Sequence, residues 1–581
     1  MAGARLNPVT TEVLGNALVS IADEILAALI KSAYSTNIKE RQDCSSVILD
    51  ADGRIVCIGD ISQPVHMSSF MFTGSAILER FPRESIREGD VFMVNDPYSG
   101  GPSHLADVTF VGPVFHGGKL LGFVGNTGHW PDVGGKAPGQ CALGDATEIY
   151  QEAIRYPPIR MYRAGELQLE VLEVVLLNVR DPDGRDGDIR AQVGSVQVGV
   201  RRMQELAERY GIEVLRSGMD ELLRVSETKV REGIRRLREG VYEAVDYLDD
   251  DLDSDEPIPM RVKVTVKHEP RPTITLDYTG TGGPARWGLN NPYSGTAACA
   301  YWVLRSLLDP SALGNDGFWR PIEMIIPEGS ILNPRPPSPV GARFEVCSQL
   351  PDLLFAALGG SKHRAATDSN LEAGSHGVHG MGFSSQGPPT FIYYETLAGG
   401  GGARPVKDGI EGVHTASNLP IEAMELEFPM MADRLEYIPD SAGAGRFRGG
   451  VGIRKDYRML VDTYVGTHSN RHKVPGPGLL GASDGTLTRI VRNFDGSESQ
   501  ELPREGALIP VDASDVVTIV SGGGGGFGDP LERDPALVLD DVLNEKVTVE
   551  GARRDYAVVV DGLTVDVEAT DLLRRERRRG G

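Results

Sequence analysis

The stretch HLADVTFVGPVFHGGKLLGFVGNTGH, residues 104–129, decides how this chain arranges its most reactive side chains. Two apolar runs rich in β-branched and aromatic residues flank Gly117-Gly118, a pattern that predicts a β-hairpin with its turn at the glycines. With the turn centred there, Asp107 falls opposite Gly128. Cross-strand neighbours lie about 5 Å apart at the Cα. Both ends of the stretch therefore return to the same end of the hairpin.

His104, Asp107 and His129 form a candidate metal site at that end. Two imidazoles and one carboxylate suit zinc, manganese or iron, and three protein ligands leave a position for water or substrate. We expect the site in an open loop region, because functional groups concentrate on loops that a rigid scaffold holds. The alternative is that both histidines only hydrogen-bond the polar ends of the hairpin.

Loops dense in Gly, Pro, Asn and Asp flank the hairpin on both sides. Asp96 lies in the loop before it and Asp132 in the loop after it. Either carboxylate could accept a hydrogen bond from a ligand histidine or act as a general base. The plainer alternative for each is a turn-capping role.

Composition limits the classes of partner and the compartment. The 581 residues carry a net charge of -23, which argues against a nucleic-acid partner because phosphate binding needs basic patches. The basic end, Arg574–Gly581, reads as a short solvated tail. We see neither an apolar run of 18 residues nor a secretory signal, and five widely spaced cysteines favour a reducing compartment. We therefore expect a cytoplasmic protein with no membrane span.

The hydrophobic pattern predicts an α+β chain of several domains, with antiparallel sheets, the metal-bearing hairpin and glycine-rich loops. An N-terminal metal-binding α/β region should cover 1–248, an acidic linker 249–259, and a β-rich region with glycine-rich loops 260–581. The elements expected along the chain are an amphipathic helix at 11–34, two or three helices within 192–248, an antiparallel strand pair at 260–280 and a buried helix at 293–308.

Motifs along nearly the whole chain resemble the B-type subunit of the hydantoinase/5-oxoprolinase family. That family includes N-methylhydantoinase, caprolactamase, 5-oxoprolinase, and the acetone and acetophenone carboxylases. The motifs that carry the resemblance are NPVTTEVLGNAL (7–18), NIKERQDCSSVILDADGRIV (37–56), PVHMSS (64–69), NDPYSGGPSHLADVTFVGPVF (95–115), GHWPDVGG (128–135), ATEIYQEAIRYPP (146–158), DSAGAGRFRGGVGIR (440–454) and GGGGGFGDPLERDP (522–535).

The resemblance implies one divalent transition metal, zinc, manganese or iron, in this chain. The ligands of the carboxylase branch, a His-x-x-Asp pair and a later His, carry over onto His104, Asp107 and His129. Many relatives read His-His-x-Asp where this chain has Trp130 in the second place, which removes an imidazole beside the metal. The implied partner is an A-type subunit of the sugar-kinase/actin ATPase fold that binds ATP and Mg, in a hetero-oligomer with two copies of each chain.

The function that the resemblance implies is that of the metal-containing catalytic subunit of an ATP-dependent cyclic-amide hydrolase. The partner would transfer a phosphoryl group from ATP to the amide oxygen, and the metal would lower the pKa of a water. Asp132 or Glu148 would take the proton, and Asp96 would orient a ligand. One alternative is an ATP-dependent ketone carboxylase of the acetone or acetophenone type, and a second is a non-catalytic scaffold for the ATPase subunit.

Glycine-rich segments raise two further possibilities. Gly522–Gly526 could cradle a phosphate through backbone N–H groups, although the chain lacks a Gly-x4-Gly-Lys-Ser/Thr motif, and a tight turn or linker is the plainer alternative. His376, His379 and His414 could form a second metal site, but no ligand spacing supports one.

Overall fold

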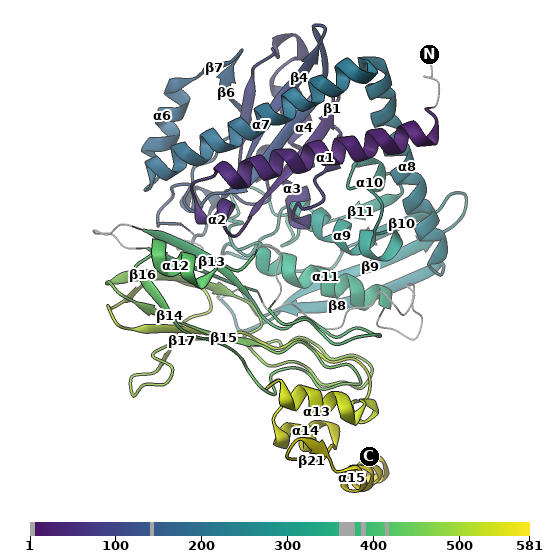
Figure 1. Cartoon of the computed structure of the whole chain (residues 1–581), viewed down its shortest axis with the longest axis vertical. Helices are drawn as coiled ribbons and strands as arrows, with labels where there is room; N and C mark the ends of the chain where they lie inside the picture. The colour runs from purple at the N-terminus through teal and green to yellow at the C-terminus, as the bar shows by residue number, and fades with distance from the viewer. Residues whose placement is uncertain are drawn as a thin grey trace. The chain divides into compact units, whose positions relative to one another are not determined.

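The structure, a computed structural model, divides by its contacts into two compact units (Figure 1). Unit 1 comprises Met1–Val241, Lys263–Arg343 and Thr415–Leu419, and unit 2 comprises Tyr242–Val262, Phe344–His414 and Pro420–Gly581. Residues 249–259, the predicted linker, belong to unit 2 in this division. The structure describes residues 6–139, 145–251, 253–359, 378–384, 391–412 and 417–580.

A seven-stranded antiparallel sheet is the framework of unit 1, and the predicted hairpin supplies its middle strands. The strand order is β2-β1-β5-β4-β3-β6-β7. Gly117 and Gly118 form the turn with φ of 57° and 72°, as the pattern predicts for a two-residue hairpin loop. The strands are β1 (Cys44–Asp50), β2 (Ile55–Ile58), β3 (Val91–Val94), β4 (Asp107–His116), β5 (Lys119–His129), β6 (Ile159–Arg163) and β7 (Glu166–Leu167).

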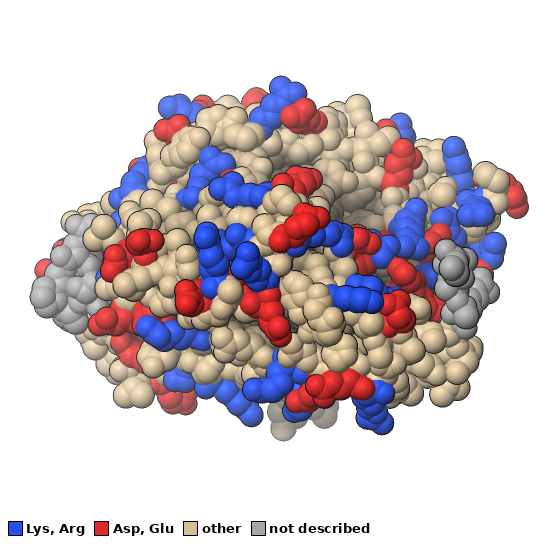
Figure 2. Space-filling view, turned by 90° about the horizontal axis from the view of Figure 1, so that it is seen from above, with Lys and Arg blue, Asp and Glu red and all other residues tan. Residues whose placement is uncertain are grey.

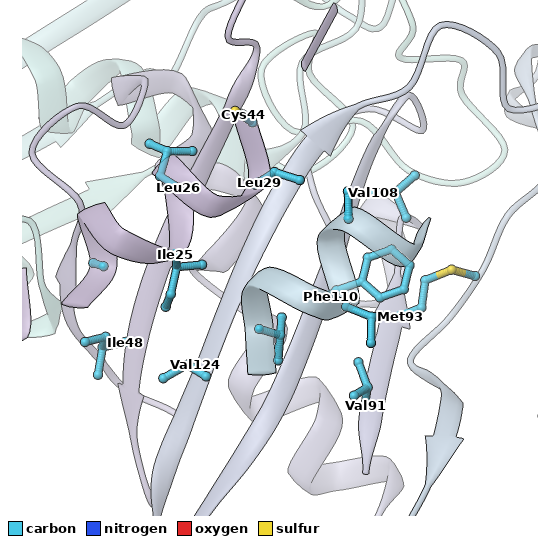
Figure 3. Close-up of a cluster of buried hydrophobic side chains, with 14 of the residues drawn as sticks. Ile25, Leu26, Leu29, Cys44, Ile48, Val91, Met93, Val108, Phe110 and Val124 are labelled. Carbon is cyan, nitrogen blue, oxygen red and sulfur yellow. The ribbon is translucent and has the colours of Figure 1, made fainter. Parts of the chain in front are cut away.

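Two long helices cover one face of this sheet. Both α1 (Pro8–Ser32) and α7 (Pro182–Tyr210) contact the central strands and each other (Figure 1). Side chains of α1, including Ile25 and Leu29, pack among Val124, Phe110 and their neighbours on the strands (Figure 3). Burying apolar side chains of this size stabilises the fold by about 1.5–3 kcal/mol each. The hydrophobic core of unit 1 therefore lies between these helices and the sheet.

The predicted N-terminal helix is confirmed, with an earlier start. The Asn7 side chain accepts the backbone N–H of Thr10, and Pro8 occupies the first turn, where its missing N–H costs nothing. Among the described residues, α1 is the helix whose length and mean hydropathy of 1.8 would suffice to cross a membrane, and half of that window is buried inside the structure. Its apolar face packs against α7 and β1.

On the other side of the sheet lie η1 (Pro64–His66) and α3 (Met67–Phe70). Both of them contact α9 (Tyr293–Leu308). The buried helix predicted at 293–308 is confirmed by α9. The remaining helices of unit 1 are α2 (Thr36–Lys39), α4 (Thr73–Arg80), α5 (Ile149–Glu152), α6 (Leu169–Leu177), α8 (Ile212–Arg236) and α10 (Asp316–Trp319).

The helical prediction for 192–248 is right for α7 and α8 but wrong for its last part. Residues 240–248 form strand β8 (Gly240–Leu248), where exposed and less exposed side chains follow the two-residue period of a strand. The predicted strand pair is confirmed: β9 (Ile258–Lys267) runs antiparallel to β10 (Thr273–Asp277), with Lys263 opposite Asp277. β10 also pairs in parallel with β11 (Ile322–Ile325).

Unit 2 contains two antiparallel sheets, with strand orders β13-β12-β16-β19 and β14-β15-β20-β17-β18. The first sheet consists of β12 (Val378–Ser384), β13 (Ile392–Ala398), β16 (Thr463–Ser469) and β19 (Gly506–Val511). The second consists of β14 (Met430–Tyr437), β15 (Ile453–Met459), β17 (Arg489–Arg492), β18 (Gln500–Glu501) and β20 (Val516–Val520). Its helices before the C-terminal region are α11 (Phe344–Gly359) and α12 (Ile421–Glu427).

Glycine-rich segments of unit 2 lie side by side in a bundle and form backbone hydrogen bonds with one another. Gly450 N donates to Gly401 O, Gly524 N donates to Gly450 O, and Gly443 N donates to Gly524 O, each at 2.8–2.9 Å. A Cβ on Gly400 would overlap the carbonyl oxygen of Gly450. We call the segments 399–403, 441–452, 476–485 and 521–528 the glycine bundle.

The glycine bundle excludes the phosphate-cradle interpretation of Gly522–Gly526. The N–H groups of Gly522, Gly523, Gly524 and Gly526 already donate to Thr488, Thr486, Gly450 and Ser483. A phosphate would have to compete with these internal bonds. The segment is also not a plain turn or linker, because its backbone is the shared partner of the other bundle segments.

The C-terminal residues fold into a small helical region of unit 2, and the mainly basic residues 575–579 within it are exposed to solvent as predicted. Helices α13 (Pro535–Leu543), α14 (Val549–Tyr556) and α15 (Val567–Gly580) surround the two-stranded pair β21 (Val560–Asp561) and β22 (Thr564–Val565). Arg574 donates to the carbonyls of Tyr556 and Arg533, which ties the basic end to the fold. Figure 2 shows basic and acidic side chains interspersed over the face that it presents.

Candidate metal centre

The register of the hairpin brings Asp107 directly opposite His129. Pairing Asp107↔His129 differs by one residue from the predicted pairing with Gly128, because a β-bulge shifts the ladder between Val114 and Phe115. Residues opposite each other in an antiparallel pair project to the same face of the sheet. The observed register therefore supports the predicted metal site, because the side chains of Asp107 and His129 start from adjacent backbone positions on one face.

The three predicted ligands converge. Their candidate donor atoms all lie within 4.8 Å of one another, and His104 Nε2 lies 3.0 Å from Asp107 Oδ2. Donors bound to one zinc ion at about 2.0–2.2 Å would lie somewhat closer together, so only small shifts would close the set. The ring centroids of His104 and His129 are 5.2 Å apart. The arrangement fits a small divalent cation.

The three candidate ligands are buried, so the prediction of a site in an open loop region is wrong. Their burial also determines their protonation states. His104, Asp107 and His129 are 5%, 0% and 3% exposed. Burial lowers the pKa of His104 and lowers that of His129 to about 4. Burial alone would raise the pKa of Asp107, but His104, His66 and Arg343 around it hold that pKa well below its usual range. The site therefore offers neutral imidazoles and an ionised carboxylate, the forms that bind metals.

Polar contacts fix which nitrogen of each histidine faces the site. The side-chain amide of Asn37 lies 3.2 Å from Nδ1 of His129; with its oxygen turned to accept Nδ1–H, Nε2 of His129 is the nitrogen left for the metal. Nε2 of His104 faces Asp107, while its Nδ1 and the Oδ1 atom of Asp107 are buried without a hydrogen-bond partner. Buried polar atoms of this kind are costly unless something satisfies them. A bound cation would satisfy the carboxylate oxygen.

Three charged or polar neighbours were not predicted from the sequence. Asp43 precedes β1 and its backbone carbonyl accepts the N–H of His129 at 2.9 Å. His66, from η1, lies with its Nε2 3.4 Å from Asp43 and 3.7 Å from Asp107. Arg343 places Nη2 3.2 Å from Asp107. The family-like segments 37–56 and 64–69 contain the first two residues, and nothing in the sequence around Arg343 indicates its position.

A buried glutamate holds the loop that carries Arg343. The carboxylate of Glu152 accepts the backbone N–H groups of Val340 and Gly341 at 3.1 and 2.7 Å. Burial raises the pKa of Glu152 to about 8. Ala342 N donates to Gly288 O in the same loop. The path of the backbone towards Asp107 is thus fixed on both sides.

Asp96 and Asp132 hold loops together. Asp96 accepts the backbone N–H of Tyr98 and forms a two-pronged ion pair with Arg155 at 3.1 and 2.9 Å. Asp132 accepts the backbone N–H of Gly139 and both the backbone and side chain of Arg180. These contacts match the capping alternative that the loop composition allowed. A catalytic role for either residue stays a prediction.

Glu148 and Trp130 lie in different settings. The half-buried Glu148 precedes α5, and its side chain makes no capping hydrogen bond there. Trp130 is fully buried: its Nε1 donates to Gln192 of α7 at 2.7 Å, and the guanidinium of Arg185 stacks 4.6 Å from its ring. Because successive strand residues alternate faces, Trp130 packs on the α7 side while His129 faces the site.

The possible second metal site lies largely outside the described residues, as do His376, His414 and Cys141. The side chain of His379 is not described either. Within the described part of the chain, the side chains that group as three candidate metal ligands are His104, Asp107 and His129. Cys44, Cys57, Cys299 and Cys347 are not joined in disulfides.

Residues 7–530 match the Hydantoinase B/oxoprolinase family, and the chain belongs to that family. The putative B-type subunit of a D-/L-hydantoinase from Pseudomonas sp. (strain NS671) is 32% identical, with 98% of each chain covered. The beta chain of the caprolactamase from Pseudomonas jessenii is 29% identical over 96% of this chain and 97% of its own. The resemblance that the motifs predicted is confirmed.

Two solved structures share the fold. The ATP-dependent caprolactamase from Pseudomonas jessenii superimposes with a TM-score of 0.87 and 26% identity, covering 98% of this chain and 100% of that one. A nucleotide-free acetone carboxylase superimposes with the same TM-score at 20% identity, covering 99% of this chain and 83% of that one. The second likeness concerns the fold alone.

Proposed function

We propose that this chain is the metal-containing catalytic subunit of an ATP-dependent hydrolase of cyclic amides, working with an A-type subunit that binds ATP and Mg. The observation that carries the proposal is the convergence of His104, Asp107 and His129 in a chain that aligns end to end with a hydantoinase subunit and with the beta chain of caprolactamase. Both of these relatives are subunits of larger enzymes, which supports a partner chain for this one.

The chemical problem is the stability of the amide. Resonance gives the C–N bond partial double-bond character, so water attacks an unstrained lactam or hydantoin slowly. Phosphorylation of the amide oxygen on the partner would make the ring carbon electrophilic. A divalent metal held by His104, Asp107 and His129 would act as a Lewis acid and make an attacking water more acidic.

The residues of the chain would supply fixed charge and proton transfer. Arg343 is a permanent cation beside Asp107, positioned to stabilise negative charge as it develops near the metal. Glu148 is the better candidate for taking a proton, because Asp132 is already held by Gly139 and Arg180. Asp96 would act indirectly, by fixing the loop before His104 through its pair with Arg155.

ATP would bind on the partner. The chain has no Gly-x4-Gly-Lys-Ser/Thr sequence, and the N–H groups of four of the five glycines at 522–526 are occupied by internal bonds. We propose a hetero-oligomer, with the metal in this chain and the nucleotide in the other. The ligand set indicates a class of metals, zinc, manganese or iron, and does not select one of them.

The deciding experiment is co-expression with an A-type subunit, followed by an ATPase screen. Hydantoin, caprolactam and 5-oxoproline form one arm, and acetone or acetophenone with bicarbonate forms the other. ATP turnover that rises with a cyclic amide and releases the ring-opened acid supports the proposal. Stimulation by a ketone with bicarbonate alone would replace it with a carboxylase. Absence of a bound transition metal in the purified chain would favour the scaffold alternative.

A further inference from the structure

A histidine outside the predicted ligand set lies between two carboxylates at the metal centre. His66 is 2% exposed and places Nε2 3.4 Å from an oxygen of Asp43 and 3.7 Å from Oδ1 of Asp107. Asp43 and Asp107 come from the ends of different strands, β1 and β4, while His66 comes from η1. One imidazole therefore spans the ends of two strands that do not pair with each other.

The hydrogen bonds of Ser45 determine where the imidazole proton lies. The Ser45 hydroxyl oxygen accepts the backbone N–H of Gln63 at 3.0 Å and lies 2.9 Å from Nδ1 of His66. Ser45 is fully buried, so its hydroxyl hydrogen needs an acceptor. Nδ1 of His66 lies within hydrogen-bond distance and fills that role. A ring nitrogen that accepts a hydrogen bond carries no proton. In the singly protonated ring the proton therefore lies on Nε2, which faces both carboxylates.

The strand register places the whole arrangement on one face of the sheet. Ser45 pairs with Thr127, two residues before His129, so Ser45 and His129 project to the same side. Asp107, directly opposite His129, projects there as well. The hydrogen bond from the backbone N–H of Gln63 to the side-chain hydroxyl of Ser45 fixes the start of η1 against β1. The Ser45 hydroxyl therefore anchors both η1 and the imidazole of His66.

We propose that His66 is a positioning residue for the metal centre: its Nε2–H dipole, directed by Ser45 and 3.7 Å from Oδ1 of Asp107, favours by electrostatic attraction the carboxylate orientation that binds the cation. The inference rests on the metal site of the proposed function and adds a residue that the ligand set does not contain. Polar groups beside metal ligands commonly change metal affinity by about 10–100-fold when removed. The same N–H group also faces Asp43 at 3.4 Å, so one imidazole contacts two buried carboxylates.

The test compares variants that keep or remove the N–H donor. His66→Phe retains the ring volume and removes the donor, whereas His66→Gln carries a side-chain N–H at a similar reach. Ser45→Ala keeps His66 but removes both the group that selects its tautomer and the acceptor of the Gln63 backbone N–H. Thr127→Val is the matched control, because it deletes a buried hydrogen bond to Thr109 on the same sheet face without touching His66.

Each full-length variant is titrated with zinc against a chromogenic chelator, and its cobalt(II) form is examined by visible absorption. We expect zinc affinity to fall about 10–100-fold in His66→Phe, to recover largely in His66→Gln, and to fall less in Ser45→Ala. The cobalt bands should shift in His66→Phe, and Thr127→Val should match the parent chain in both measurements.

Three outcomes would overturn the inference. Parent-like affinity and cobalt bands in His66→Phe would show that the donor is irrelevant. Equal losses in His66→Phe and His66→Gln would assign the effect to packing instead. A parent chain that binds neither metal would remove the metal site itself, and with it the proposed function, whereas the first two outcomes leave that function intact.

Discussion

The guanidinium of Arg343 lies 3.2 Å from the carboxylate of Asp107, across a sequence separation of 236 residues. Both side chains are buried, at 4% and 0% exposure. Removing one partner of a buried ion pair leaves the other charge uncompensated, at a cost of about 3–5 kcal/mol. The metal-free chain therefore depends on this contact for stability as well as for the geometry of the site.

A double-mutant cycle measures that dependence. Arg343→Met and Asp107→Asn should each lower the free energy of unfolding of the metal-free chain. The loss in Arg343→Met should be about 3–5 kcal/mol, because the buried carboxylate of Asp107 loses its compensating charge. The double variant should lose less than the sum of the two single losses, since no uncompensated charge remains. Urea unfolding in the presence of a chelator provides the measurement. Additive losses would mean that the two charges do not interact.

Loss of a ligand should abolish metal binding. His129→Ala removes an imidazole from a buried position, so metal content measured by elemental analysis should fall to background and turnover by several orders of magnitude. His116→Ala, at the turn end of the same hairpin, is the control and should retain both metal and activity. Equal losses in the two variants would mean that the hairpin matters only for folding.

The low pKa of His129 predicts how acid affects the metal-free chain. Its folded pKa of about 4 lies below the unfolded value of 6.5, so between these values the unfolded state binds more protons than the native state. Stability should be fully present above pH 6.5 and should fall by about 3 kcal/mol towards pH 4. His129→Asn should reduce this slope and leave the part due to the buried His104, which urea unfolding at several pH values would reveal. An unchanged slope would contradict the assignment.

Glu152 should act with the opposite sign. Its folded pKa of about 8 exceeds the ordinary value of 4.5, so the native state binds the extra proton between those values. Stability from this group is therefore greatest at low pH and decreases as the pH rises towards 8. Glu152→Gln should flatten the alkaline part of the stability profile while the acid part, due to His129, persists. A parallel downward shift of the whole profile would indicate a purely packing role.

Gly524, at the centre of the glycine bundle, should tolerate no side chain. In Gly524→Ala, the new Cβ would overlap the carbonyl oxygen of Gly401, and a backbone atom cannot move aside as a flexible side chain can. We expect loss of soluble protein or a cooperative loss of unit 2 structure in circular dichroism. Gly194→Ala is the matched control, because no atom lies within 4 Å of the added carbon in α7, where alanine should stabilise the helix by about 0.5–1 kcal/mol.

The local sequence pattern predicts the helices and strands better than the register in which the strands pair. The hairpin, α1, α9 and the β9–β10 pair follow from periodicity and turn residues, which are properties of neighbouring positions. The bulge at Val114–Phe115, which moves His129 opposite Asp107, has no comparable signature. The helical prediction fails at 240–248 because charged and apolar positions alternate there in a way that also fits a strand edge.

For the site, the sequence predicts the groups that lie close together along the hairpin. Asp43 and His66 reach it through sheet pairing and the packing of η1, and Arg343 reaches it through a loop clamped by Glu152. Such contacts depend on tertiary structure, and spacing along the chain carries no information about them. The capping contacts of Asp96 and Asp132, by contrast, follow from the Asx-turn tendency of aspartate in loops.

The glycine bundle also has a thermal consequence. Heat capacity rises on unfolding when apolar surface meets water and falls when polar surface does. The bundle segments bury many backbone amides against one another, beside a small apolar cluster around Ala403 and Phe527. Per residue, their unfolding should therefore contribute less heat capacity than the α1–α7 core, and the free energy that they add should vary less with temperature. Their contribution to unit 2 should weaken little on cooling, where apolar packing loses strength.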